Sequence, residues 1–280
     1  MKKFIAEFLG TFILVFIGCG AMVAINALVA GMGLTIPLGF SALTVALAFG
    51  LALALGYESF GTISGGHMNP ALTIAAYIDG RMESIKQTCG YIIAQFAGGI
   101  AAGCILYLVT AQKASLGQNG YSYNSALQVN ETTAIIIELL LTFFFVSFYL
   151  FRTKTAQHGS LDGIVIGLAF AACYIVALPF TGASLNPARS LGPAIFVGDQ
   201  ALRQVWIFIL VPVVAGILAA LVYKYLTKAE VTKEKPKDKA IADDDSKDES
   251  HNIVEPEIET HMDYYNIELI KAIEEARKEK

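Results

Sequence analysis

Six long apolar runs dominate the chain and restrict the folds that are open to it. They cover about residues 4–28, 36–57, 87–110, 133–151, 161–179 and 202–226. Each run approaches the roughly 20 residues that a helix needs to cross a bilayer. Because lipid satisfies no backbone polar groups, such segments must be helical. The sequence therefore predicts an all-α membrane protein with six transmembrane helices, and the even number of spans places both chain ends on one side.

Composition and charge agree with a membrane protein. Hydrophobic residues make up 55% of the 280 residues and charged residues only 16%, whereas about a quarter of a soluble chain is charged. The formal charge of −4 combines +2 over residues 1–227 with −6 over residues 228–280. A body with so few cations excludes nucleic-acid binding through a basic face. The four cysteines lie in apolar runs without CxxC spacing, which indicates neither disulfides nor a zinc site.

The placement of lysine and arginine predicts the orientation. One side of the six-span topology carries Lys2, Lys3, Arg81, Lys86, Arg152, Lys154, Lys224 and Lys228, and the other carries Lys113 and Arg203. Cytoplasmic loops are the ones enriched in these residues. We therefore expect a multi-pass protein of the cell membrane with both termini in the cytoplasm.

Two further apolar stretches are too short to span a bilayer. Residues 63–78 (ISGGHMNPALTIAAYI) and 181–197 (TGASLNPARSLGPAIFV) each place an Asn-Pro-Ala triplet between a small-residue loop and a short apolar run. Asparagine is a good helix cap, and proline is favoured in the first helical turn. Each stretch predicts a loop followed by a re-entrant half-helix.

The chain contains an internal repeat. Asn69-Pro70-Ala71 and Asn186-Pro187-Ala188 lie at equivalent positions, and Glu7 in the first span corresponds to Glu138 in the fourth. The copies cover about residues 1–110 and 133–227, and three spans per copy mean that the second enters the membrane inverted. Residues 1–227 are thus predicted to form one channel domain, in which the amino ends of the half-helices meet near the midplane.

Non-helical backbone at that depth is tolerated where it lines a water-filled cavity or is buried in protein. The two loops are therefore predicted to present carbonyl groups to a pore. The carbonyl-bearing residues are Gly65, Gly66, His67, Met68, Gly182, Ser184 and Leu185. Asn69 and Asn186 would offer amide donors where the positive ends of two helix dipoles meet, which admits neutral solutes and repels cations.

The charged residues inside the spans have different predicted roles. An intramembrane charge is by default a functional candidate, and Arg189 lies one turn after Asn186, nearer the outer mouth. It is expected to repel cations and donate hydrogen bonds to solutes. Glu7 and Glu138 have no visible relay partners, so we interpret them as acceptors that brace the loops.

The duplicated Asn-Pro-Ala boxes, SGGHMNPA and NPARS, resemble the major intrinsic protein family of aquaporins and glycerol facilitators over residues 1 to about 227. The resemblance implies a right-handed bundle of six tilted helices, a pore in each subunit and a homotetramer. It also implies an outer selectivity filter formed by Phe49, Tyr174, Ala183 and Arg189. Phe49 and Ser190 fit the water-selective branch. Tyr174 and Ala183 match neither branch, and the direction in which Tyr174 points is left open.

We therefore expect a passive water channel that excludes protons and ions, with a facilitator of glycerol or other small neutral solutes as the alternative. An ion-coupled secondary transporter is a weaker alternative, because inverted repeats also serve alternating access. Neither an enzyme nor a cofactor is predicted, since no nucleophile, metal cluster or paired carboxylate occupies the pore segments. The physiological solute and gating stay open.

The last part of the chain has a different character. Residues 228–280 are rich in charge and are predicted to form a cytoplasmic tail that is largely disordered. Near its end, Tyr264, Ile267, Ile270 and Ile273 recur at helical spacing, which favours a short amphipathic helix over 262–278. The family resemblance does not extend to this tail, and its partner is unknown.

Overall fold

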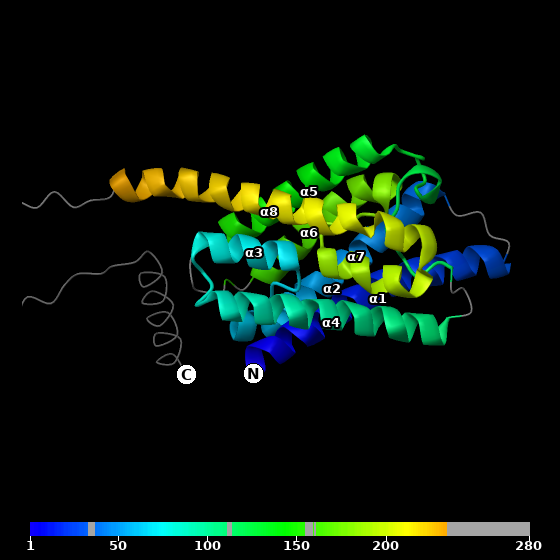
Figure 1. The fold of residues 1–280 in the computed structure, drawn as a ribbon, viewed down its shortest axis with the longest axis horizontal. Coiled ribbons are helices and arrows are strands. Elements are labelled where there is room, and N and C mark those ends of the chain that lie inside the picture. The colour runs from blue at the N-terminus through cyan, green and yellow to red at the C-terminus, as the bar shows by residue number, and fades with distance from the viewer. Residues whose placement is uncertain (33–36, 111–113, 155–158, 160, 234–280) are drawn as a thin grey trace, which may run out of the picture. The chain divides into compact units, whose positions relative to one another are not determined.

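The computed structural model describes residues 1–32, 37–110, 114–154, 159 and 161–233, and these residues contain helices but no strand (Figure 1). The helices are α1 (Lys2–Met32), α2 (Leu38–Ser64), α3 (Pro70–Asp79), α4 (Ile85–Val109), the short 3-10 helix η1 (Ser122–Asn124), α5 (Glu131–Arg152), α6 (Asp162–Thr181), α7 (Pro187–Val197) and α8 (Asp199–Lys233). The prediction of an all-α fold is confirmed.

Six of the described helices are long and apolar enough to cross a membrane, namely α1, α2, α4, α5, α6 and α8. They expose large apolar side chains outward, such as Leu51, Phe148 and Leu168. A soluble protein would bury or avoid that many exposed apolar groups, whereas lipid accommodates them. The chain is therefore a multi-pass membrane protein, as the six apolar runs predicted.

The second span is longer than its apolar pattern suggested. We predicted its end near residue 57, but α2 continues to Ser64. It stops there because Gly65 adopts a left-handed conformation with φ of 92°, and its backbone N–H donates to the carbonyl oxygen of Gly61. Glycine takes this conformation without steric cost. The extra turns carry the chain directly to the first loop.

The two half-helices, α3 and α7, pack mainly on spans of the opposite repeat. Helix α7 lies against α4, and α3 lies against α8. Glycines permit the approach: a Cβ atom at Gly99 would lie 2.3 Å from the carbonyl oxygen of Ala188, and one at Gly216 would lie 2.6 Å from that of Ala71. Backbone therefore packs directly on backbone, which ties the two repeats together.

A second glycine contact joins α2 to α6, the most extensive helix pair in the bundle. A Cβ atom at Gly50 would lie 2.6 Å from the carbonyl oxygen of Gly167, and one at Gly167 would lie 2.4 Å from that of Gly50. Glycines in α4, α6 and α8 thus lie where helices approach closely.

The first compact unit of the chain covers residues Met1–Lys235. Its last helix, α8, continues to Lys233, beyond the predicted channel boundary at residue 227. The tail helix predicted over 262–278 lies outside the described residues.

Candidate pore and its constriction

Both half-helices begin at a capping asparagine followed by proline. The side-chain oxygen of Asn69 accepts a hydrogen bond from Ala71 N at 2.9 Å. That of Asn186 accepts from Ala188 N at 3.0 Å and from Arg189 N at 3.3 Å. Pro70 and Pro187 occupy the first helical position, where a missing N–H costs nothing. The triplets therefore begin α3 and α7 in the same way.

The amide groups of the two asparagines link the loops to each other. Asn69 Nδ2 donates to the carbonyl oxygen of Leu185, and Asn186 Nδ2 donates to that of Met68, each at 2.8 Å. We expected both amides to face a pore. An amide nitrogen carries two hydrogens, so one hydrogen of each is engaged between the loops, and whether the second faces a solute stays a prediction. The reciprocal bonds hold the amino ends of α3 and α7 together.

The loops before the asparagines have matching backbone conformations. Gly65 and Gly182 have φ of 92° and 76°, and Met68 and Leu185 have φ of 50° and 55°. Positive φ is unfavourable for a residue with a side chain, and it persists where the surroundings enforce it. The carboxylates and the crossed asparagine bonds supply that constraint, and the backbone turns outward between them.

Glu7, on α1, is fully buried and faces the first loop. Its Oε1 accepts from Ser64 Oγ at 2.6 Å and from His67 N at 3.1 Å, and its Oε2 accepts from Met68 N at 2.7 Å. Gln95 of α4 adds a donor to Oε2 at 2.7 Å. A buried carboxylate is stable only with such donors.

Glu138, on α5, makes the equivalent contacts with the second loop. Its Oε1 accepts from Thr181 Oγ1 at 2.6 Å and from Ser184 N at 2.9 Å, and its Oε2 accepts from Leu185 N at 3.0 Å. The two carboxylates thus hold otherwise unpaired loop N–H groups, which is the geometry that loop bracing requires. Gln95 has no counterpart here, because the repeat places Pro212 at that position.

Several loop carbonyls that we assigned to the pore already have a partner within the protein. Tyr149 Oη donates to the carbonyl oxygen of Gly65 at 2.6 Å, and Tyr91 Oη donates to that of Ser64 at 2.9 Å. Sequence reasoning missed both tyrosines, since nothing in an apolar helix marks a hydroxyl that reaches a distant loop. A carbonyl oxygen can accept a second bond, so Gly65 still offers a lone pair.

Three loop carbonyls have no protein donor among the described residues. They are those of Gly66, His67 and Ala183, whereas the carbonyls of Met68, Gly182, Ser184 and Leu185 each accept at least one bond. We had predicted Ala183 as a selectivity-filter residue through its side chain, and not as one of the residues that present a carbonyl group to the pore. A polar solute passing the loops would find its strongest acceptors at these three positions.

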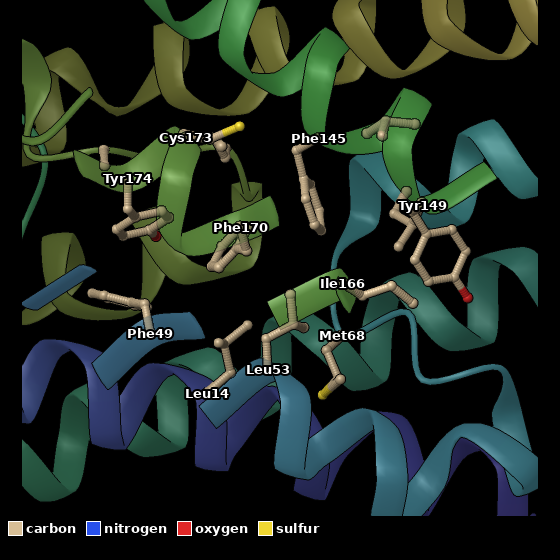
Figure 2. Close-up of a cluster of buried hydrophobic side chains, with 14 of the residues drawn as sticks. Leu14, Phe49, Leu53, Met68, Phe145, Tyr149, Ile166, Phe170, Cys173 and Tyr174 are labelled. Atoms are coloured by element: carbon tan, nitrogen blue, oxygen red, sulfur yellow. The ribbon is translucent and has the colours of Figure 1, made fainter. Parts of the chain in front are cut away.

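Of the four residues predicted to form the selectivity filter, Phe49, Tyr174 and Arg189 contact one another, and all four are fully buried. The ring of Tyr174 lies 4.4 Å from the ring of Phe49 and 4.5 Å from that of Phe170, between centroids (Figure 2). Tyr174 Oη donates to the carbonyl oxygen of Ser184 at 3.2 Å and accepts from Arg189 Nε at 3.1 Å. The Tyr174 ring therefore points toward Phe49, and its hydroxyl points toward Arg189.

Arg189 is held by acceptors on three sides. Its Nη1 donates to the carbonyl oxygen of Gly117 at 2.6 Å, and its Nη2 donates to that of Gly182 at 3.1 Å. The guanidinium carbon lies 4.9 Å from the centre of the Phe49 ring, within the range of a cation–π contact. No carboxylate pairs with it among these contacts, so its charge is retained beside the constriction.

The loop over residues 114–120 supplies part of this arrangement. Asn119 is buried and donates from Nδ2 to the carbonyl oxygen of Thr181 at 3.1 Å, while its Oδ1 accepts from Ser190 Oγ at 2.8 Å. Sequence reasoning missed both Gly117 and Asn119. They lie in a segment with neither periodicity nor a motif, and only the fold brings them to Arg189.

A cavity approaches the loops from each end of the bundle. We call them the outer and the inner cavity after the orientation that the sequence predicts. The outer cavity has a volume of about 280 Å³ and is lined by residues near the end of α1 and the start of α2, with Gly117 and Gly182. The inner one has a volume of about 590 Å³ and is lined by the start of α1, the end of α2, His67 and Gly65. Because α1 and α2 run between them, the cavities lie on opposite sides of the loops.

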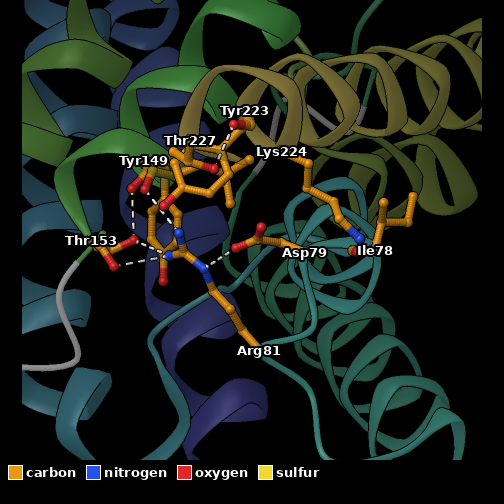
Figure 3. A network of polar contacts seen from close by, with 9 residues as sticks. Ile78, Asp79, Arg81, Tyr149, Thr153, Tyr223, Lys224 and Thr227 are labelled. Atoms are coloured by element: carbon orange, nitrogen blue, oxygen red, sulfur yellow. Dashed lines mark hydrogen bonds and ion pairs between the residues drawn. The ribbon is translucent and has the colours of Figure 1, made fainter. Parts of the chain in front are cut away.

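Arg81 fixes the far end of α3 at the inner cavity (Figure 3). It bonds to Asp79, to the carbonyl oxygen of Leu150 at 2.9 Å and to Thr153, and it lies over the ring of Tyr223 at 5.2 Å. The half-helix is thereby tied to α5 and α8. Its carboxyl end also suits a cation, because the helix dipole is negative there.

A further ion pair borders the inner cavity. Lys3 Nζ lies 2.5 Å from Glu83 Oε1, and this hydrogen bond lowers the pKa of Glu83 from its ordinary value. Both side chains are well exposed, so the pair contributes little to stability. It nevertheless connects the start of α1 to the segment that follows α3.

Six spanning helices, two half-helices that meet at capped amino ends and cavities on both sides of a polar constriction define a membrane channel. The chain belongs to the major intrinsic protein family, whose profile matches residues 1–223. This is a family of passive channels and not of enzymes.

Individual relatives fall in both branches of that family. The chain is 37% identical over 233 residues to Aquaporin Z of Rhodopseudomonas palustris, covering 81% of this chain and 93% of the relative. It is 42% identical over 226 residues to Glycerol uptake facilitator protein-like 6 of Lactiplantibacillus plantarum, covering 79% and 95%. The crystal structure of the aquaglyceroporin from Plasmodium falciparum superposes with a TM-score of 0.69 at 24% identity, covering 83% of this chain and 98% of the other, and this likeness concerns the fold alone.

Proposed function

We propose that the protein is a passive water channel driven by osmotic gradients, with its selectivity filter at Phe49, Tyr174, Ala183 and Arg189. The observation that carries the proposal is the position of Tyr174. Its ring contacts Phe49, and its hydroxyl lies between Arg189 and the carbonyl oxygen of Ser184. Water is the smallest solute with hydrogen-bonding capacity, so a constriction that is occupied in this way favours water over a polyol backbone.

Exclusion of cations follows from the charges around the path. Two half-helices direct their positive amino ends to the midplane, and Arg189 adds a full charge next to the constriction. Glu7 and Glu138 do not compensate, because their oxygens are occupied by loop N–H and hydroxyl donors. A cation would lose its water without gaining an anionic partner.

Proton exclusion follows from how a single file of water would be oriented. The asparagine amides are donors at the midplane, and the carbonyls of Gly66, His67 and Ala183 are acceptors in the two loops. Water molecules on the two sides of Asn69 and Asn186 would point their hydrogens in opposite directions. Such a file lacks the continuous chain of donors that proton hopping needs.

A facilitator for glycerol or another small neutral solute is the second candidate. The relative with 42% identity carries that description. Ala183 is small, so displacement of the Tyr174 ring would widen the proposed constriction substantially. Tyr174 therefore decides between the two functions. An ion-coupled transporter is disfavoured, because the family is one of passive channels.

The assembly and orientation belong to the same proposal. The cations at the ends of α1, α5 and α8 support an orientation with both termini in the cytoplasm. We further propose a homotetramer in the cell membrane with a pore in each subunit, as in the family that the chain belongs to. Residues 1–227 form the channel domain and residues 228–280 a cytoplasmic tail.

Stopped-flow light scattering on proteoliposomes tests the function. Vesicles that contain the purified protein are exposed to sucrose, glycerol and urea gradients and are compared with empty vesicles. We expect fast water flow and a glycerol permeability close to that of empty vesicles. Water flow no faster than in empty vesicles would refute the proposal, and rapid glycerol entry would favour the facilitator.

A further inference from the structure

A methionine sulfur lies next to the charged group of the constriction. Arg189 Nη2 donates to Met22 Sδ at 3.6 Å and to the carbonyl oxygen of Gly182 at 3.1 Å. A guanidinium nitrogen of this kind carries two hydrogens, so the thioether and the carbonyl account for both. A thioether is a weak acceptor. Several atoms accept hydrogen bonds from Arg189. Among them, the Met22 sulfur is thus the one whose strength as an acceptor can be changed by a chemical modification.

Met22 is accessible from the outer cavity. Its side chain is only partly buried against the apolar core and lines that cavity with Asn26 and Gly117. The other sulfurs near the loops are less accessible: Met68 and Cys19 are fully buried. Oxidation of sulfur groups follows their exposure. A small oxidant entering from outside therefore reaches Met22 before it reaches these two groups.

We propose that Met22 is an oxidation site through which a peroxide regulates the channel. The proposal rests on the water-channel function above. A lone pair of Met22 Sδ attacks one peroxide oxygen, the O–O bond breaks, and a sulfoxide and one water molecule form. The sulfur is oxidised by two electrons and hydrogen peroxide is reduced to water. The reaction is reversible, since reductases convert methionine sulfoxide back to methionine.

The sulfoxide changes the constriction in two ways. Its oxygen is a strong acceptor, and it replaces the weak sulfur acceptor for the same Arg189 hydrogen. This holds the guanidinium more firmly across the path next to Phe49 and Tyr174. The added oxygen also takes up space at the wall of the outer cavity, which Met22 lines. Both effects reduce the flow of water.

The experiment compares three forms of the full-length chain in proteoliposomes: wild type, Met22→Leu and Met82→Leu. Met82 lines the inner cavity and is partly exposed, which makes it the matched control. Each sample is treated with hydrogen peroxide, oxidation at every methionine is measured by peptide mass spectrometry, and water permeability is taken before and after treatment. The quantity compared is the ratio of the two permeabilities within each form.

We expect conversion of Met22 to the sulfoxide with an at least twofold fall in permeability for wild type and Met82→Leu. Met22→Leu should keep its permeability, although its cysteines are unchanged, and methionine sulfoxide reductases should restore the wild type. An equal fall in Met22→Leu, an oxidised Met22 without any fall, or a Met22 that resists oxidation while Met82 reacts would each overturn the proposal. Basal permeability of untreated vesicles tests the water-channel function separately.

Discussion

At the residue scale, the selectivity that we propose for the pore depends on one aromatic side chain. Tyr174 contacts Phe49 with its ring and Arg189 with its hydroxyl. The hydroxyl holds the ring in place, because a hydrogen bond with a charged group contributes about 1.5–3 kcal/mol. The ring packs against both Phe49 and Phe170. Substitutions at Tyr174 can therefore separate the effect of the ring's size from the effect of its hydrogen bonds.

Tyr174→Gly should raise glycerol permeability by at least about tenfold, because removal of the ring widens the constriction beside Ala183. Tyr174→Phe keeps the ring and loses the bonds to Arg189 and to the carbonyl oxygen of Ser184, so it should stay far more restrictive to glycerol than Tyr174→Gly. Both are measured by stopped-flow light scattering in a glycerol gradient. Equal glycerol permeabilities in the two variants would show that the ring does not set the width.

Arg189→Val should weaken the exclusion of cations and of urea. The substitution removes the charge beside the constriction and frees the carbonyls of Gly117 and Gly182 as additional acceptors for a solute. We expect at least about a fivefold increase in urea permeability, together with a measurable cation leak. Light scattering and a pH- or potassium-sensitive dye in the same vesicles provide the two readings. Selectivity equal to that of the wild type would exclude Arg189 from the filter.

At the scale of elements, much of the fold could be predicted because apolar length and periodicity determine which segments cross a membrane. The half-helices were predicted from Asn-Pro-Ala, whose capping requires only neighbours in sequence. What could not be predicted depends on distant atoms: the Tyr149 hydroxyl that reaches Gly65, and Gly117 and Asn119 that reach the surroundings of Arg189. The direction of the Tyr174 ring, too, is fixed by contacts with two other elements.

The loops also depend on buried carboxylates that lie on other helices, far from them in sequence. Glu138→Gln keeps the shape of the side chain but replaces one acceptor oxygen with a donor that faces the N–H of Leu185 or Ser184. A buried donor without an acceptor costs about 1–3 kcal/mol. We expect a lower melting temperature in detergent and reduced water permeability. Glu83→Gln is the control, because Glu83 is exposed, and it should melt like the wild type.

The contact of α7 with α4 should be intolerant of even one methyl group. In Gly99→Ala the new Cβ would lie 2.3 Å from the backbone oxygen of Ala188, so α7 must shift and move Asn186 with it. Overpacking of this kind costs about 1–3 kcal/mol. Thermal unfolding in detergent and water permeability should both decline. In the control Gly20→Ala the nearest atom is Leu106 Cδ2 at 3.6 Å, an ordinary contact, and that variant should behave like the wild type.

At the scale of the whole molecule, the part of the chain that matches the family ends at nearly the same place as the part with a positive net charge. The family match ends at residue 223, the first compact unit ends at Lys235, and the positive body gives way to an acidic tail from residue 228. The acidic isoelectric point therefore reflects the tail and not the channel. The duplicated loop contacts all lie within the body.

Removal of residues 234–280 should leave the channel intact. The contacts described for the loops, the constriction and both cavities involve residues up to Tyr223 of α8, and every contact that holds Arg189 lies within the first compact unit. We expect the shortened chain to keep the melting temperature and the water permeability of the full chain while its isoelectric point becomes basic, since the deleted segment carries most of the acidic residues. Isoelectric focusing, thermal unfolding in detergent and stopped-flow light scattering measure the three properties. A shortened chain that folds equally well but conducts water faster or more slowly would instead assign the tail a regulatory role.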